Sequence, residues 1–494
     1  MFTWFSKSSR TKPYAWIAVF APCAGILPFL VYTLTVSRTV YPGQSAYLTA
    51  VAAGLENHTA LTHPLFTQLM HAVAQIPLGT IAVRLNVTCC LFAALAAMLF
   101  YRFVARLIYL LAHENPSGMA HIFWDAADEE PHPTNDGEEE SDIDDDDVQP
   151  RANPLTLAEI EQQHQRTVRS ATLGALAATT FFCFSAPFWI ASTRLFSEPL
   201  HYMLVLLMLN LALDLWRQKK NIALFTCMFL AGLIWIENPV TALCAICVVI
   251  YCIVAIAKDP FITWAPISSA LAGLLSGFLF ACALLGFTAA SITTVNMLSP
   301  ISILETFARD QFATLRDYIP TYNWMAFAAF IIIPSLLALM FLKEGFQRRS
   351  WLILLAEIVW AALLIPTIIN MQQGIWHLAQ HQTNYPILVF FILAMQVGIL
   401  VAIGQHMRDG DCIQGDAEID EYEYRDNALV CKIGHGLSWL FLVLTLTTAY
   451  WYYADVQSKN TAFVDRIVQD ISRQLGTRDW IVDDTLTAYH LPIL

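Results

Sequence analysis

The sequence predicts an all-α protein that crosses a membrane many times. Of its 494 residues, 57% are hydrophobic and only 14% are charged. A soluble protein carries about 45–50% apolar residues and about a quarter charged ones. The apolar residues also occur in runs long enough to cross about 30 Å of hydrocarbon as helices. These observations exclude a soluble enzyme, a fibrous protein and a disordered protein.

We expect about eleven transmembrane helices, each on one apolar run. The runs at 221–236 and 239–257 are separated only by Glu237 and Asn238, so they should form a tight helical hairpin with Pro239 as the breaker. The expected spans are 14–36, 80–110, 168–191, 199–216, 221–236, 239–257, 264–288, 324–342, 351–369, 385–405 and 434–454.

Basic residues near the span ends predict the orientation, because Lys and Arg concentrate in cytoplasmic loops. They place the N-terminus in the cytoplasm and the C-terminus on the outer face of a multi-pass integral membrane protein (of the inner or plasma membrane in a bacterial host). The run at 14–36 is longer than a signal-peptide core and is predicted to be an uncleaved first span. The basic residues are Lys7, Arg10, Lys12, Arg102, Arg106, Arg217, Lys219, Lys220, Lys343, Arg348 and Arg349.

One acidic insert carries the whole net charge of −13. Thirteen of the 40 acids lie between Asp125 and Asp147, and the remaining 27 balance the 27 Lys and Arg. The insert, 113–165, is rich in Asp, Glu and Pro, so we expect it to be a disordered cytoplasmic loop. A neutral body gives no support for a nucleic-acid partner. The expected divisions are the N-terminal spans with the first outer loop at 1–112, the insert at 113–165, the remaining bundle at 166–454 and an outer-face tail at 455–494.

The outer loops are predicted to hold short amphipathic helices that lie on the membrane surface. Two of them fall in the first outer loop, at 44–55 and 64–76, and a third covers 301–317. The tail at 455–494 is expected to be the start of a small or truncated soluble domain. It should contain a helix over 461–475 and a short strand over 479–483.

Polar residues on the outer side are the candidates for chemistry, because ionisable groups at the membrane are functional candidates by default. A carboxylate can act as general base on a hydroxyl, and arginine can hold a lipid phosphate through two parallel hydrogen bonds. Each residue also has an ordinary alternative role. Glu198, for example, could simply place negative charge at a helix N-terminus. The candidates are Glu56 and His63, Arg84 and Asn86, Arg194 with Glu198 and His201, and Glu237 with Asn238.

A series of short motifs runs through the first half of the chain. In order, they are Gly43, His63-Pro64-Leu65, Ile76-Pro77, Arg84-x-Asn86, the small-residue run 92–97, Pro187-Phe188-Trp189 through Glu198-x-x-His201, and Gly232-Leu233 through Asn238. Together they resemble a family of membrane proteins whose domain has no assigned name. That family has the GT-C glycosyltransferase architecture and includes an animal protein O-mannosyltransferase of the secretory pathway.

The resemblance implies a GT-C-like bundle that acts at the membrane lipid on a polyprenyl-phosphate sugar donor. The sugar would pass to a protein or glycan acceptor on the outer face, with inversion at the anomeric carbon. By this resemblance, Arg84 or Arg194 would face the donor phosphate, and His63 and Asn86 would line the pocket.

The chain departs from the family pattern at one place. Members of the family carry a pair of acids early in the first outer loop, where this chain has Gly-Gln-Ser-Ala-Tyr at 43–47 and neither acid. Either Glu56, Glu198 or Glu237 then serves as the base, or the activity is altered or lost. A divalent cation is also less well supported, because hard cations need several oxygen ligands.

The sequence is therefore compatible with three functions. The best supported is a membrane glycosyltransferase, more specifically a hexosyltransferase, in which we expect Glu56 or Glu198 to lie within reach of Arg84. A catalytically inactive GT-C-like scaffold, or a partner in envelope export, is the main alternative. A transporter is third, because transporters usually contain internal repeats and none is visible in the sequence.

Overall fold

The computed structural model of the protein is an all-helical bundle over the residues that it describes. These are 13–41, 44–55, 63–113, 157–217, 221–238, 264–292 and 384–410, with isolated positions between 242 and 253, 305 and 309, and 436 and 473. Every regular element within these ranges is a helix. The predicted all-α class is therefore confirmed for this part of the chain.

The helices fall into a long set and a short set. The long helices are α1 (Pro13–Thr35), α4 (Ile81–His113), α6 (Leu157–Cys183), α8 (Glu198–Arg217), α9 (Asn221–Glu237), α11 (Trp264–Ile292) and α16 (Asn384–Gly410). The short helices are α2 (Gln44–Ala52), α3 (Pro64–Ala74) and α7 (Ala186–Thr193). The spans expected at 324–342 and 351–369, and the strand expected at 479–483, lie outside the described residues.

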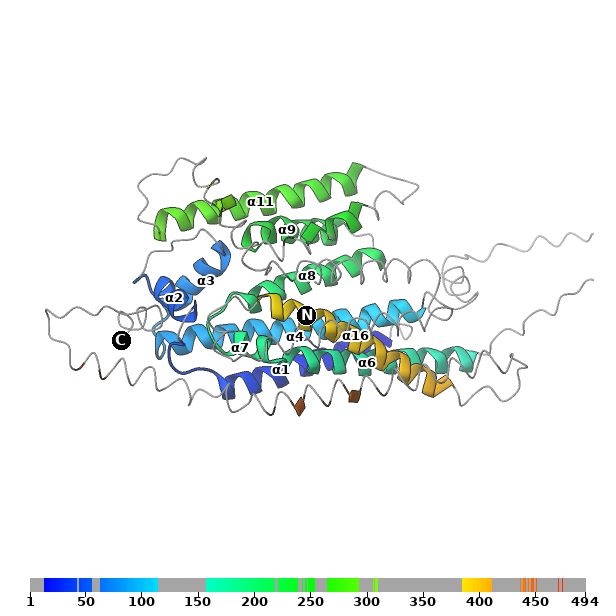
Figure 1. Cartoon of the computed structure of the whole chain (residues 1–494). Coiled ribbons are helices and arrows are strands. Elements are labelled where there is room, and N and C mark those ends of the chain that lie inside the picture. The colour runs from blue at the N-terminus through cyan, green and yellow to red at the C-terminus, as the bar shows by residue number, and fades with distance from the viewer. Residues whose placement is uncertain are drawn as a thin grey trace, which may run out of the picture.

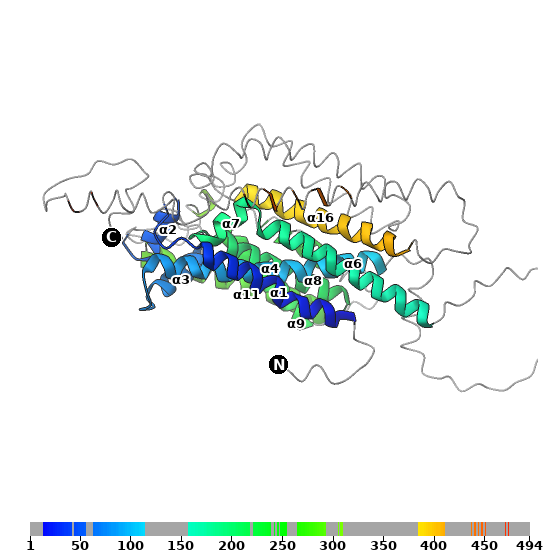
Figure 2. The same cartoon turned by 90° about the horizontal axis from the view of Figure 1, so that it is seen from below.

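The long helices lie side by side in a fixed order. Helix α11 packs on α9, α9 on α8 and α8 on α4, while α1 and α6 pack on α4, and α16 packs on α6 (Figure 1). The short helices α2, α3 and α7 gather near one end of this bundle, as both views show (Figures 1 and 2). That end holds the candidate site.

Three described helical segments are long and apolar enough to cross a membrane: Ile81–Tyr109, Glu198–Leu215 and Trp264–Thr288. A fourth results if α6 and α7 form one span, although their axes are bent by 66°. The bend interrupts the run predicted at 168–191, and Pro187 in the first turn of α7 is its sequence signal.

Two expectations need correction. Helix α6 begins at Leu157, so residues 157–165, which we expected to be disordered, are helical; this segment is rich in the helix formers Ala, Leu, Glu and Gln. Helix α2 was expected to lie on the membrane surface, but nearly all of its residues are buried. Its small Ser, Ala and Thr side chains allow neighbours to approach on every side.

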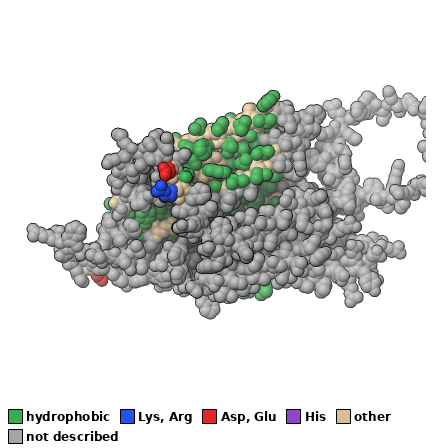
Figure 3. All heavy atoms as spheres, turned by 45° about the horizontal axis from the view of Figure 1, so that its top comes forward, with side chains coloured by type: hydrophobic (Ala, Val, Ile, Leu, Met, Phe, Trp, Pro, Cys, Tyr) green, Lys and Arg blue, Asp and Glu red, His purple; other side chains and the backbone are tan. Residues whose placement is uncertain are grey.

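The outer face of α9 and α11 is apolar (Figure 3). On α11, the side chains of Trp264, Leu279 and Phe287 are 83%, 65% and 62% exposed. A soluble protein rarely leaves so many large apolar side chains together in water, whereas lipid tails would cover them.

Glycines let α9 and α11 touch through their backbones. A Cβ atom added to Gly273 or Gly277 on α11 would collide with the backbone of Phe225 or Phe229 on α9. Gly232 on α9 approaches the backbone of α11 in the same way. Glycines spaced four apart are a common device for close helix packing within lipid.

Replacement of Gly277 by alanine should separate these two helices. We expect Gly277→Ala to destabilise the protein by about 1–3 kcal/mol, the usual cost of overpacking, measured as thermal unfolding in detergent. Gly286→Ala is the matched control, because nothing lies within 4 Å of a Cβ atom at that position of the same helix. Equal melting temperatures for the two variants would contradict the close contact.

Candidate functional site

The candidate site begins where the chain enters α3. His63 precedes the helix and has φ 54° and ψ 51°, a left-handed conformation that non-glycine residues rarely adopt. The next residue, Pro64, disfavours the right-handed helical conformation at His63. The imidazole is buried, and the backbone oxygen of His63 accepts hydrogen bonds from both the N–H and the hydroxyl of Thr67. The strained residue is thus held firmly at the start of α3.

A carboxylate from a distant part of the sequence caps this helix. Pro64 has no N–H, and the next two backbone N–H groups, of Leu65 and Phe66, donate to Oε2 and Oε1 of Glu237, each at 2.9 Å. Glu237 is the last residue of α9 and is 1% exposed. A negative charge at a helix N-terminus is favourable because the unpaired N–H groups and the helix dipole both point toward it.

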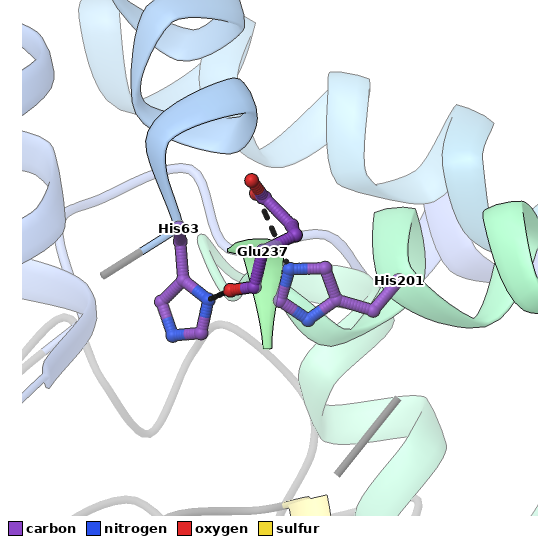
Figure 4. A group of neighbouring side chains, drawn as sticks. All are labelled: His63, His201 and Glu237. Carbon is purple, nitrogen blue, oxygen red and sulfur yellow. Dashed lines mark hydrogen bonds and ion pairs between the residues drawn. The ribbon is translucent and has the colours of Figure 1, made fainter. Parts of the chain in front are cut away.

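Two histidines complete the cluster around this carboxylate (Figure 4). Nδ1 of His63 donates to the backbone oxygen of Glu237 at 2.8 Å, and Nε2 of His201 lies 3.4 Å from Oε1 of Glu237. The Asn238 amide nitrogen lies 3.2 Å from Nδ1 of His201. The two imidazole rings are tilted by 39° with their centroids 4.8 Å apart.

The cluster has the chemistry of a metal site. His63, His201 and Glu237 each offer one ligand atom, and these atoms all lie within 4.8 Å of one another. All three residues are buried, and they come from three different elements: the start of α3, the first turn of α8 and the end of α9. The three side chains could therefore hold a metal ion.

A buried arginine lies in the segment between α7 and α8. Arg194 is 1% exposed, and its guanidinium carbon stands 3.8 Å from the centroid of the Tyr41 ring, a cation–π contact. Among the described residues, its Nη1 atom has no hydrogen-bond partner. Burial lowers the pKa of this guanidinium from its ordinary value, while the nearby Tyr41 opposes the shift. Sequence analysis singled out Arg194 but not Tyr41, for which no sequence signal was available.

Glu198 opens α8 close to the cluster. It is 2% exposed and lies three residues before His201, so the two side chains share a face of the first turn. The structure thus brings four of the predicted residues into contact at one end of the bundle, namely His63, His201, Glu237 and Asn238, and Glu198 lies in the helix turn that carries His201.

The remaining candidates behave differently. Asn86 is buried, and its amide donates to the backbone oxygen of Ser37 at 2.8 Å, so it holds the segment that follows α1. Arg84 is half-buried in the first turn of α4, and no ion pair in the described part of the chain joins it to the cluster. Glu56 lies outside the described residues, so its predicted approach to Arg84 stays a prediction.

Sequence comparison adds no family: no family model and no curated protein matches the chain. The resemblance to GT-C glycosyltransferases therefore stays an expectation, and the geometry carries the functional argument.

Replacing Glu237 by glutamine should weaken the cap on α3. A glutamine side chain keeps one oxygen but points an N–H₂ group toward a backbone N–H, leaving a buried donor unpaired at a cost of about 1–3 kcal/mol. We expect Glu237→Gln to lower the thermal unfolding temperature. The control, Glu305→Gln, removes a 69% exposed carboxylate that pairs with Arg309 and should change stability by less than about 1 kcal/mol. Similar unfolding temperatures would show that the cap contributes nothing.

Proposed function

We propose that the protein is a multi-pass membrane glycosyltransferase that uses a polyprenyl-phosphate sugar as donor. The sugar passes to a protein or glycan acceptor on the outer face of the membrane. The apolar face of α9 and α11 and the close glycine contacts support a lipid environment. The polar residues gathered at one end of the bundle support a single reaction centre.

The observation that carries the proposal is the buried guanidinium of Arg194. A charge removed from water is costly unless an opposite charge or several hydrogen bonds compensate it. The guanidinium stands over the ring of Tyr41, and within the described residues the Nη1 atom of Arg194 lacks an acceptor. A donor phosphate supplies both the negative charge and the acceptor oxygens, and arginine binds phosphate through a planar, forked set of donors.

The reaction needs a base for the acceptor hydroxyl, and Glu198 is the better candidate among the described acids. Both oxygens of Glu237 already accept backbone hydrogen bonds. In the proposed step, the acceptor oxygen attacks the anomeric carbon while its proton passes to the Glu198 carboxylate. The bond between the anomeric carbon and the phosphate oxygen breaks, and polyprenyl phosphate leaves with its charge held by Arg194.

An inactive scaffold is the second candidate, and one observation favours it. The carboxylate of Glu237 caps α3, which is a structural role. His201, Glu237 and Asn238 are also almost fully buried. A protein that had lost its activity could keep this capping contact, because the contact holds the first outer loop against the bundle.

Donor binding separates these candidates. The experiment measures the binding of a panel of radiolabelled polyprenyl-phosphate sugars to the protein in lipid nanodiscs, and we expect saturable binding. Arg194→Gln should weaken this binding about ten- to a hundredfold, because it removes the charged hydrogen-bond donors of the guanidinium. The control, Arg309→Gln, replaces a 75% exposed arginine and should leave binding unchanged. Absence of binding across the panel, or equal binding by both variants, would contradict the proposal and favour the scaffold.

Transfer is tested separately from binding. Glu198→Gln should keep donor binding within about twofold but stop the release of polyprenyl phosphate, because the amide cannot accept the proton. Unchanged release would remove Glu198 from the role of base.

A further inference from the structure

We propose that His63, His201 and Glu237 form a zinc site that joins α3 to α8 and α9. This inference goes beyond the proposed function and stands whether or not the protein transfers sugar. Two imidazole nitrogens and one carboxylate oxygen favour zinc or a similar transition metal over Mg²⁺ or Ca²⁺, which prefer oxygen ligands throughout.

The spacing of the ligand atoms supports a shared ion. Two ligands bound to one tetrahedral zinc at about 2.0–2.1 Å stand about 3.3 Å apart. Nε2 of His201 and Oε1 of Glu237 are 3.4 Å apart, which matches this value and is long for a charge-assisted hydrogen bond of about 2.7–2.9 Å. The ligand atoms all lie within 4.8 Å of one another, so binding would bring them closer together by up to about 1.5 Å.

The hydrogen bond of His63 determines which of its ring nitrogens can bind a metal. A backbone oxygen only accepts, so Nδ1 of His63 must carry the proton in its 2.8 Å contact with the Glu237 carbonyl. In the neutral ring, the lone pair then resides on Nε2, which lies on the side of the ring away from Glu237 and His201 (Figure 4). Metal binding therefore requires the ring to turn about its Cβ–Cγ bond, which brings Nε2 to the ion.

Asn238 can orient the ring of His201 for a metal. As placed, its amide nitrogen faces Nδ1 of His201, which directs the proton of the ring to Nε2. A half-turn of the amide presents the oxygen instead, so that Nδ1–H donates and Nε2 is left to bind the ion. The Glu237 carboxylate has about four acceptor positions, so it can bind a metal while it continues to cap α3.

Zinc added as its chloride to metal-stripped full-length protein in nanodiscs tests the site. We expect one tightly bound zinc per chain by elemental analysis, and a cobalt-substituted protein with the strong visible absorption of tetrahedral Co²⁺. His63→Gln and His201→Gln should weaken binding by more than about a hundredfold, and Asn238→Leu by about ten- to a hundredfold, as for other groups that orient a ligand.

The matched control is His71→Gln. His71 lies on the same helix as the site, is half-buried and contacts the backbone oxygen of Ala52 at 3.0 Å, so its loss should leave zinc binding unchanged. Each variant is compared at equal amounts of folded protein, shown by its melting temperature without metal. Less than one zinc per chain, octahedral cobalt spectra, or the same affinity in all four variants would overturn the site.

Discussion

The capping of α3 by Glu237 is the interaction on which the rest of the site depends. The chain reaches α3 through a left-handed histidine, and Pro64 removes one of the backbone donors. Glu237 accepts the next two, and its own backbone oxygen accepts a hydrogen bond from His63. Three hydrogen bonds thus fix the start of a short helix to the end of a long one. A hydrogen bond to a charged group contributes about 1.5–3 kcal/mol, so the two that reach the carboxylate should stabilise this junction by a few kcal/mol.

The same junction explains why the polar residues are gathered where they are. Helix α8 begins close to the junction, so its first turn places His201 against Glu237 and carries Glu198 as its first residue. Arg194 is buried immediately before that turn. Away from this end, the described helices pack mainly through apolar and small side chains and close backbone contacts. Polar links between α4 and α8 include the ion pair of Arg106 and Asp214 and the hydrogen bond from the Asn210 amide to the Leu99 oxygen. A polar centre at one end of an apolar bundle is an arrangement suited to a reaction at a membrane surface.

Sequence reasoning located most of the described helices, because apolar runs and breakers such as Pro and Asn are local signals. It also named His63, His201, Glu237 and Asn238 as candidates, since ionisable residues in apolar surroundings are conspicuous. It did not foresee that Glu237 caps α3, because that contact joins residues 171 and 172 positions apart. The stacking of Arg194 on Tyr41 and the burial of α2 were missed for the same reason: both depend on tertiary packing, which a local pattern does not encode.

Hydrogen–deuterium exchange at the start of α3 tests the central claim, that the Glu237 carboxylate holds this helix. In the wild-type protein, the amides of Leu65 and Phe66 should exchange slowly. In Glu237→Gln, they should exchange at least tenfold faster, while peptides from α11 keep their wild-type protection. Equal protection at Leu65 and Phe66 in the two proteins would contradict the account, because it would mean that something other than this carboxylate fixes α3.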